Sequence, residues 1–201
     1  MALTRDRVMR AGCSSTGRAG KMQHWVALLR GVNVGGANMV PMAKLREVAA
    51  GLGWQGVRSH LASGNLVFAA AGEAEGLARA LEGALTQALG VSAAVLVIAA
   101  PDWAAMLAEC PFAPDAGKAV HGFFCWQTPL LDEGLLATLI APSETVQVRG
   151  KVIWLHAPEG VGRSKLAAKM GAVAGKVQMT ARNLNTIRAL AEMLDEARGA
   201  C

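Results

Sequence analysis

The fold of the first half of the chain is decided by residues 57–70, VRSHLASGNLVFAA. Two apolar runs flank the triplet Ser63-Gly64-Asn65, a pattern typical of a β-hairpin whose glycine adopts a positive φ. Apolar and amphipathic stretches alternate on both sides of this hairpin. They predict a strand at 24–32, a helix at 41–52 with Pro41 in its first position, a helix at 75–89 and a strand at 93–99. The order β-α-β-β-α-β matches the ferredoxin-like split βαβ unit.

The second half contains the same kinds of element in a less regular order. The patterns predict a short helix at 102–110, a strand at 119–127, a short helix around 132–140, a hairpin of 144–149 with 151–156, a helix at 164–174, a short strand at 177–180 and a helix at 184–197. The chain is therefore expected to be α+β, with units at 22–100 and 101–201. No internal sequence repeat supports a duplication.

The basic character of the chain is concentrated at its beginning. The 201 residues carry a net charge of +5 with a pI of about 9.3. Residues 1–21 hold five basic residues and one acidic residue, which leaves 15 basic against 14 acidic groups in the rest. A nearly neutral body argues against nucleic-acid binding. We expect residues 1–21 to be a disordered basic tail, or to precede a functional start at Met22.

Segment 83–101 carries no charge and has nearly the length that a membrane-spanning helix needs. Gly90 and neighbouring polar residues divide it, so a helix end followed by a buried strand is expected instead. The tail has no apolar stretch of the kind that secretory signals need. The four cysteines show no Cys-x-x-Cys pair and no metal-ligand spacing. Reduced thiols in the cytoplasm fit this usage, and no metal site is expected.

The loop after the first strand, RGVNVGGANMVP, combines flexibility with polarity. Its functional candidates are Arg30, Asn33, Gly35, Gly36 and Asn38. Successive backbone amides in such a loop can form an anion-binding concavity beside the N-terminus of the next helix. The alternative is a loop whose asparagines only cap their own turns. Likewise, the hairpin tip Ser63-Gly64-Asn65 is explained by turn formation alone.

Two helix starts carry further candidates for anion binding. In GVGRSKL, the candidates are Arg163, Ser164 and Lys165, and the serine is also a natural N-cap. In TARNLNT, the candidates are Arg182, Asn183 and Asn185, which exceed what one helix cap requires. An arginine beside asparagines at a helix start favours an anion.

No arrangement of catalytic residues stands out. The sequence shows no Ser/His/Asp or Cys/His pairing and no carboxylate pair in a polar motif. Whether the protein is an enzyme, and with which cofactor, stays open. An RNA-recognition strand is disfavoured, because HGFFCWQ has Cys125 where the second stacking aromatic should stand.

The polar motifs together resemble a widespread bacterial family, domain of unknown function family 1697. The matching stretches are ALLRGVNVGGANMVPMAKLR, SGNLVF, CPF, GVGRSKL and TARNLNT, and they extend from about Gln23 to Leu194. The resemblance implies two ferredoxin-like α+β subdomains with mixed or antiparallel sheets. It implies that the family pattern includes Arg30, Asn33, Gly35, Gly36, Ser63, Gly64, Asn65, Ser164, Lys165, Arg182, Asn183 and Asn185. Cys110 and Leu184 depart from that pattern, and the family offers no activity to transfer.

These observations lead to one functional hypothesis and two alternatives. We expect the four polar loops to form one cleft that binds an anionic small molecule, with phosphorylated compounds included. The alternatives are a nucleic-acid-binding module and a non-catalytic interaction protein. No membrane association is expected, and the oligomeric state stays open.

Overall fold

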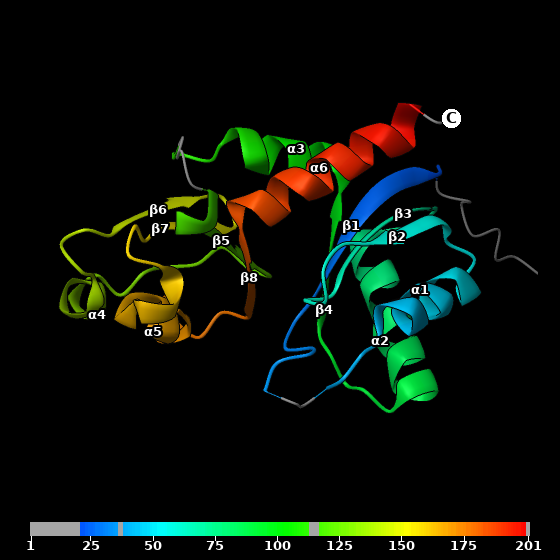
Figure 1. The fold of residues 1–201 in the computed structure, drawn as a ribbon, viewed down its shortest axis with the longest axis horizontal. Coiled ribbons are helices and arrows are strands. Elements are labelled where there is room, and N and C mark those ends of the chain that lie inside the picture. Colours follow the sequence, from blue (N-terminus) through cyan, green and yellow to red (C-terminus); the bar gives the residue numbers. More distant parts are fainter. Residues whose placement is uncertain (1–20, 36–37, 113–116, 200–201) are drawn as a thin grey trace, which may run out of the picture.

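The computed structural model describes residues 21–35, 38–112 and 117–199, which form two α+β units in tandem (Figure 1). The N-terminal unit consists of β1 (Gln23–Leu29), α1 (Met42–Gly51), β2 (Gln55–Ser59), β3 (Asn65–Ala70), α2 (Ala74–Leu89), β4 (Val95–Ala99) and α3 (Ala100–Ala108). The C-terminal unit consists of the 3-10 turn η1 (Gly117–Ala119), β5 (Val120–Cys125), α4 (Glu133–Leu139), β6 (Thr145–Arg149), β7 (Val152–His156), the turn η2 (Val161–Arg163), α5 (Lys165–Val173), β8 (Met179–Asn183) and α6 (Leu184–Gly199).

The two units have the same topology. The sheets run β2-β3-β1-β4 and β6-β7-β5-β8, and every neighbouring pair is antiparallel. Each strand order is that of a ferredoxin-like βαββαβ unit, and each final strand continues directly into a helix, of 9 residues in α3 and 16 in α6. The expected α+β class is confirmed. The two units also share one topology, although their sequences show no repeat.

The first strand is apolar from Trp25 to Leu29 because both of its faces are buried there. Trp25, Ala27 and Leu29 belong to the core beneath α1 and α2, whereas Val26 and Leu28 point to the opposite side of the sheet. A strand buried on one face only would alternate apolar with polar residues. The continuous apolar run therefore indicates a second layer on the far side of the sheet.

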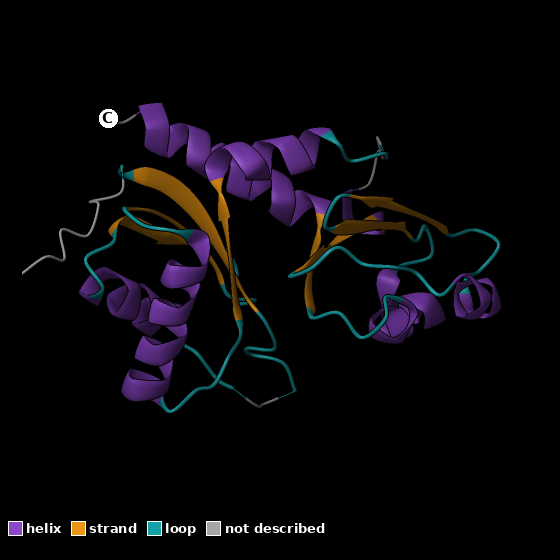
Figure 2. Cartoon of the chain, turned by 180° about the vertical axis from the view of Figure 1, so that it is seen from behind, coloured by secondary structure: helices purple, strands orange, loops and turns teal. Residues whose placement is uncertain are grey.

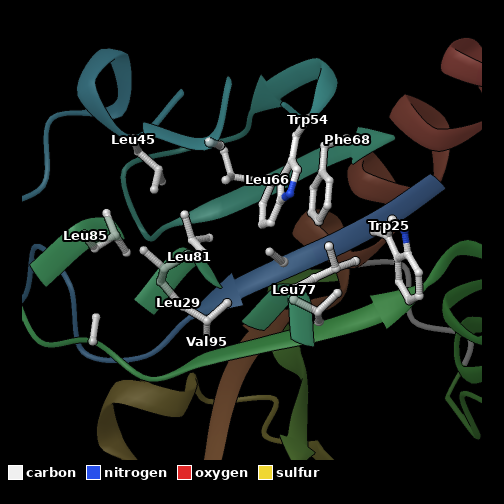
Figure 3. Close-up of a cluster of buried hydrophobic side chains, with 14 of the residues drawn as sticks. Trp25, Leu29, Leu45, Trp54, Leu66, Phe68, Leu77, Leu81, Leu85 and Val95 are labelled. Carbon is white, nitrogen blue, oxygen red and sulfur yellow. The ribbon is translucent and has the colours of Figure 1, made fainter. Parts of the chain in front are cut away.

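The core of the N-terminal unit lies between its sheet and the helices α1 and α2. Figure 3 shows side chains from β1 and β3 meeting leucines of the two helices. The rings of Trp54 and Phe68 stack with centroids 3.9 Å apart and an interplanar angle of 7°. Leu77, Leu81 and Leu85 are four residues apart, which places them on one face of α2, and all three point inward.

A separate core lies between the two units. The inner faces of both sheets pack against α3 and α6, which lie side by side above them (Figure 2). Trp103 of α3 stacks on Phe124 of β5 with centroids 5.0 Å apart, and its indole Nε1 donates to the Ile187 carbonyl at 3.2 Å. Both faces of β5 are thus covered, and Phe124 is unavailable for stacking on an RNA base.

Several sequence-based boundaries differ from the structure, and the strands predicted at 24–32, 93–99 and 119–127 are shorter, at Gln23–Leu29, Val95–Ala99 and Val120–Cys125. The strand predicted at 177–180 is β8, Met179–Asn183, so the TARN motif ends a strand before it starts a helix. Helix α3 begins two residues before the predicted start, and Pro41 is the N-cap of α1 and not its first helical residue. Segment 83–101 forms the end of α2, then β4. Within the described part of the chain, no helix combines the length and apolarity that crossing a bilayer requires.

Candidate functional site

The main candidate site is a polar cavity of about 580 Å³ where the two units meet, which we name the arginine cavity. It is lined by Arg30, Gly31, Asn38, Ser92, Ala94, Met179, Thr180, Ala181 and Arg182. The β1–α1 loop and the segment before β4 form one wall, and β8 forms the other. The ionisable groups of this lining are two arginines, and no carboxylate is among them.

Arg182 is the most constrained side chain of the cavity, because all of its N–H groups have acceptors. Its Nη2 donates to the carbonyls of Leu29 at 2.8 Å and of Ser63 at 2.9 Å, and its Nε donates to Asn65 Oδ1. Its Nη1 donates to Thr180 Oγ1 at 2.8 Å and to the Ala181 carbonyl at 2.7 Å. One guanidinium therefore joins β8 to the end of β1 and to the β2–β3 turn.

The charge of Arg182 is buried without a counter-ion. The residue is 7% exposed, its acceptors are all neutral, and none of the ion pairs in the described residues involves it. Burial lowers the pKa of its guanidinium to about 10. A buried cation of this kind leaves a positive field at the cavity wall, which a bound anion would compensate.

Arg30 supplies the second positive charge, in a different setting. It follows β1 directly, and its amide donates to the Ala94 carbonyl at 2.9 Å. Its side chain is exposed and makes no hydrogen bond or ion pair within the described residues. Arg30 can therefore change its rotamer to meet a ligand, whereas Arg182 cannot.

The asparagines of the β1–α1 loop hold the loop itself. Asn33 donates to the carbonyls of Val40 at 2.9 Å and Ala62 at 2.7 Å, and its Oδ1 accepts from the Val40 amide. Asn38 lines the arginine cavity and donates to the Gly31 carbonyl at 3.2 Å, and among the described residues its Oδ1 accepts no hydrogen bond. Gly35 has a φ of +60° and lies in open space, and Gly36 is outside the described residues.

The β2–β3 turn is built for close packing. Gly64 has a φ of +74°, and a Cβ there would lie 2.7 Å from Val32 Cγ2 and 2.8 Å from Leu29 Cβ. Asn65 is fully buried; it donates to the His60 carbonyl and to Ser63 Oγ, and accepts from Arg182. These residues position Arg182 and do not face the cavity as ligand donors.

The two asparagines at the start of α6 have different environments: one caps the helix, and the other lies at the surface. Asn183 Oδ1 accepts from the amide of Thr186 at 2.9 Å and from its hydroxyl at 3.0 Å, as an N-cap side chain does. Asn185 is exposed, and its Oδ1 lies against Gly117, where a Cβ would be 2.0 Å away. Neither asparagine lines the arginine cavity.

The third polar motif lies in a different cavity. Arg163, Ser164 and Lys165 border a hollow of about 260 Å³ together with Glu144 and Glu159. Ser164 is the N-cap of α5 and accepts from the Ala167 amide at 2.9 Å. The structure therefore brings together the β1–α1 loop, the β2–β3 turn and the TARN motif, whereas the motif at 163–165 lies apart from them. The two carboxylates also balance the two cations there, which makes the hollow a poorer anion site.

Two cavity residues, Ser92 and Thr180, were not among the predicted site residues. Thr180 lies two residues before Arg182 on the same face of β8, and only the placement of this motif in a strand brings its hydroxyl to the guanidinium. Ser92 is a single polar residue in an apolar segment, and no motif marks it. Among the described residues, no group of three or more His, Cys, Asp and Glu side chains could hold a metal ion.

The family assignment rests on the sequence match. Residues 22–154 match the family described as "Protein of unknown function (DUF1697)". The chain belongs to this family. The structure is also similar to that of the conserved bacterial protein SP0830 from Streptococcus pneumoniae, with a TM-score of 0.63 and 25% sequence identity over 87% of this chain and 99% of the other. No curated protein matches this member of the DUF1697 family.

Proposed function

We propose that the protein binds an anionic small molecule in the arginine cavity. The observation that supports this most is the charge of the lining, in which both ionisable residues are arginines and one is buried without a counter-ion. A volume of about 580 Å³ is within the usual range for small-molecule sites. Phosphate and carboxylate compounds are the class that a guanidinium recognises best.

The two arginines have different roles in this proposal. Arg30 contacts the anion directly, because its guanidinium is exposed and its donors are unused within the described residues. Asn38 and Ser92 add neutral hydrogen bonds from the same wall. Arg182 acts through its charge alone, since its N–H groups already have acceptors. Its fixed position keeps the field in place before the ligand arrives.

The test is anion-dependent stabilisation of the full chain. Thermal unfolding is followed with inorganic phosphate, pyrophosphate or citrate, each compared with sodium chloride of equal ionic strength. A ligand present at 100 times its Kd stabilises the folded state by about 2.7 kcal/mol. We expect at least one of these anions to raise the Tm, and Arg30→Gln to weaken its binding about tenfold.

Arg188→Gln is the matched control. Arg188 is exposed on α6 and does not line the arginine cavity, so its loss changes the net charge by the same amount. Equal anion effects in the Arg30 and Arg188 variants would overturn the proposal. So would a response to all three anions no larger than the response to chloride.

A further inference from the structure

A second cavity lies beside the free edge of β4, and we name it the tryptophan cavity. Its volume is about 410 Å³. It is lined by Gln23, Trp25, Glu73, Ala74, Leu96, Val97, Ile98, Ala99, Asp102, Met106, Phe124, Cys125, Trp126 and Lys151. Four consecutive residues of β4 thus border one cavity, which is the arrangement expected when the cavity runs along a strand edge.

The hydrogen-bond register shows which backbone groups of β4 face this edge. The Arg30 amide donates to the Ala94 carbonyl, so Ala94 bonds towards β1. The Val95 amide points the other way, because it donates to Glu82 Oε1 at 2.8 Å. Alternation along an antiparallel strand then directs Leu96 and Ile98 to β1, and directs the N–H and C=O of Val97 outward.

Val97 has no outward partner in the described part of the chain. β4 pairs with β1 alone there, and the Val97 amide and carbonyl make no other hydrogen bond. A donor and an acceptor that are unpaired at a strand edge can pair with the backbone of an added strand. Val97 presents both beside the tryptophan cavity, which it lines.

The equivalent edge of the C-terminal unit differs at one carbonyl, which a side chain of the same strand caps. β8 has the same length and place as β4, and Trp126 N donates to the Gln178 carbonyl as Arg30 N does to Ala94. The outward residue of β8 is therefore Ala181, and its carbonyl accepts from Arg182 Nη1 at 2.7 Å. On β4 the position equivalent to Arg182 is occupied by Ile98, whose side chain has no donor for the Val97 carbonyl.

The walls of the tryptophan cavity differ on its two sides. Phe124 and Met106 lie on the inter-sheet side, where Leu96 and Ile98 also point, and Trp126 borders the cavity two residues after Phe124. Glu73, the N-cap of α2, lies on the side that Val97 faces, and Asp102 borders the same cavity. Neither carboxylate makes an ion pair within the described residues.

We propose that the β4 edge binds an extended peptide segment as an added strand, with a basic side chain flanked by apolar ones. The residue opposite Val97 exchanges two hydrogen bonds with it, and its side chain lies on the same face, towards Glu73. The neighbouring peptide side chains lie on the inter-sheet face against Phe124, Trp126 and Met106. At about 3.3 Å per residue, Leu96–Ala99 matches three to four peptide residues.

The probe is fluorescein-labelled Leu-Lys-Leu-amide, with binding to the full chain measured by fluorescence polarisation. We expect saturable binding. Methylation of the backbone amide nitrogen of the lysine should weaken it at least tenfold, because methylation removes the N–H that donates to the Val97 carbonyl. Replacing the lysine by glutamate should weaken binding by a similar factor. Slower hydrogen exchange of the Val97 amide on binding would locate the contact.

Glu73→Gln should weaken binding at least threefold, whereas Glu75→Gln, in the same first turn of α2 and exposed, should leave it unchanged. Trp126→Ala should also weaken it. Equal binding of the methylated and unmethylated peptides would overturn the proposal, as would unaltered exchange at Val97. Self-association of the chain through this edge, seen as a dimer by light scattering, would overturn it too.

Discussion

Replacing Arg182 by methionine removes the guanidinium that joins the two units. The substitution leaves the buried Asn65 Oδ1 without a donor, and it leaves the buried Leu29 carbonyl with only the 3.5 Å hydrogen bond from Thr180 Oγ1. Each buried acceptor left without a donor costs about 1–3 kcal/mol. Removing a desolvated cation offsets part of this loss. We expect a net loss of about 3 kcal/mol, a large part of the ~5–15 kcal/mol that a typical fold has.

Urea unfolding of the full chain measures this change. With a slope of about 2 kcal/mol per molar urea, a loss of about 3 kcal/mol lowers the midpoint by about 1.5 M. Arg182→Lys should recover little of the loss, because one ammonium cannot replace a fork that reaches acceptors on three segments.

Arg188→Met is the control for the removal of a charge. Its side chain is exposed on α6, so a change within about 0.5 kcal/mol is expected. If Arg182→Met and Arg188→Met unfold at the same midpoint, the contacts of Arg182 do not hold the units together.

Three further outcomes follow from single residues. Gly64→Ala should lower the free energy of unfolding by about 2–4 kcal/mol, because it adds the Cβ contacts to a strained φ, whereas Gly35→Ala in open space should cost only about 1 kcal/mol in the same urea assay. Burial lowers the pKa of His121 below 6.5, so the unfolded chain takes up a proton that the folded chain does not. Stability should therefore fall as the pH drops below about 6.5, and urea midpoints of His121→Gln should show a weaker fall. Burial raises the pKa of the Cys125 thiol to about 11, so iodoacetamide at pH 7.5 should leave that site unmodified until urea is added, as read by mass spectrometry.

Most of the elements could be predicted because their patterns are local. The hairpin at Gly64 and the leucines of α2 follow from turn chemistry and helical spacing, and both are where the sequence places them. The end of β8 could not be found in this way. Thr180 and Arg182 are polar residues on a strand face that the other unit buries. Polar residues directly before a helix instead predict a helix cap, so the sequence gives no sign of a buried strand there.

The candidate site shows the same limit. Composition identifies an arginine among asparagines, but it cannot distinguish a guanidinium that meets a ligand from one that meets carbonyls. Arg30 and Arg182 look alike in the sequence and differ in exposure and contacts. The motif around Ser164 is separate because α5 covers the outer face of its sheet, whereas the TARN motif faces inward. That separation depends on topology, which no short motif encodes.

The tandem arrangement gives two strand edges of the same topology different chemistry. In a symmetric dimer of one βαββαβα unit, both final strands would carry the same side chains. A single polypeptide has no such constraint, because each unit has its own sequence. β8 therefore carries Arg182 at the position where β4 has Ile98, and only one of the two strands presents a guanidinium.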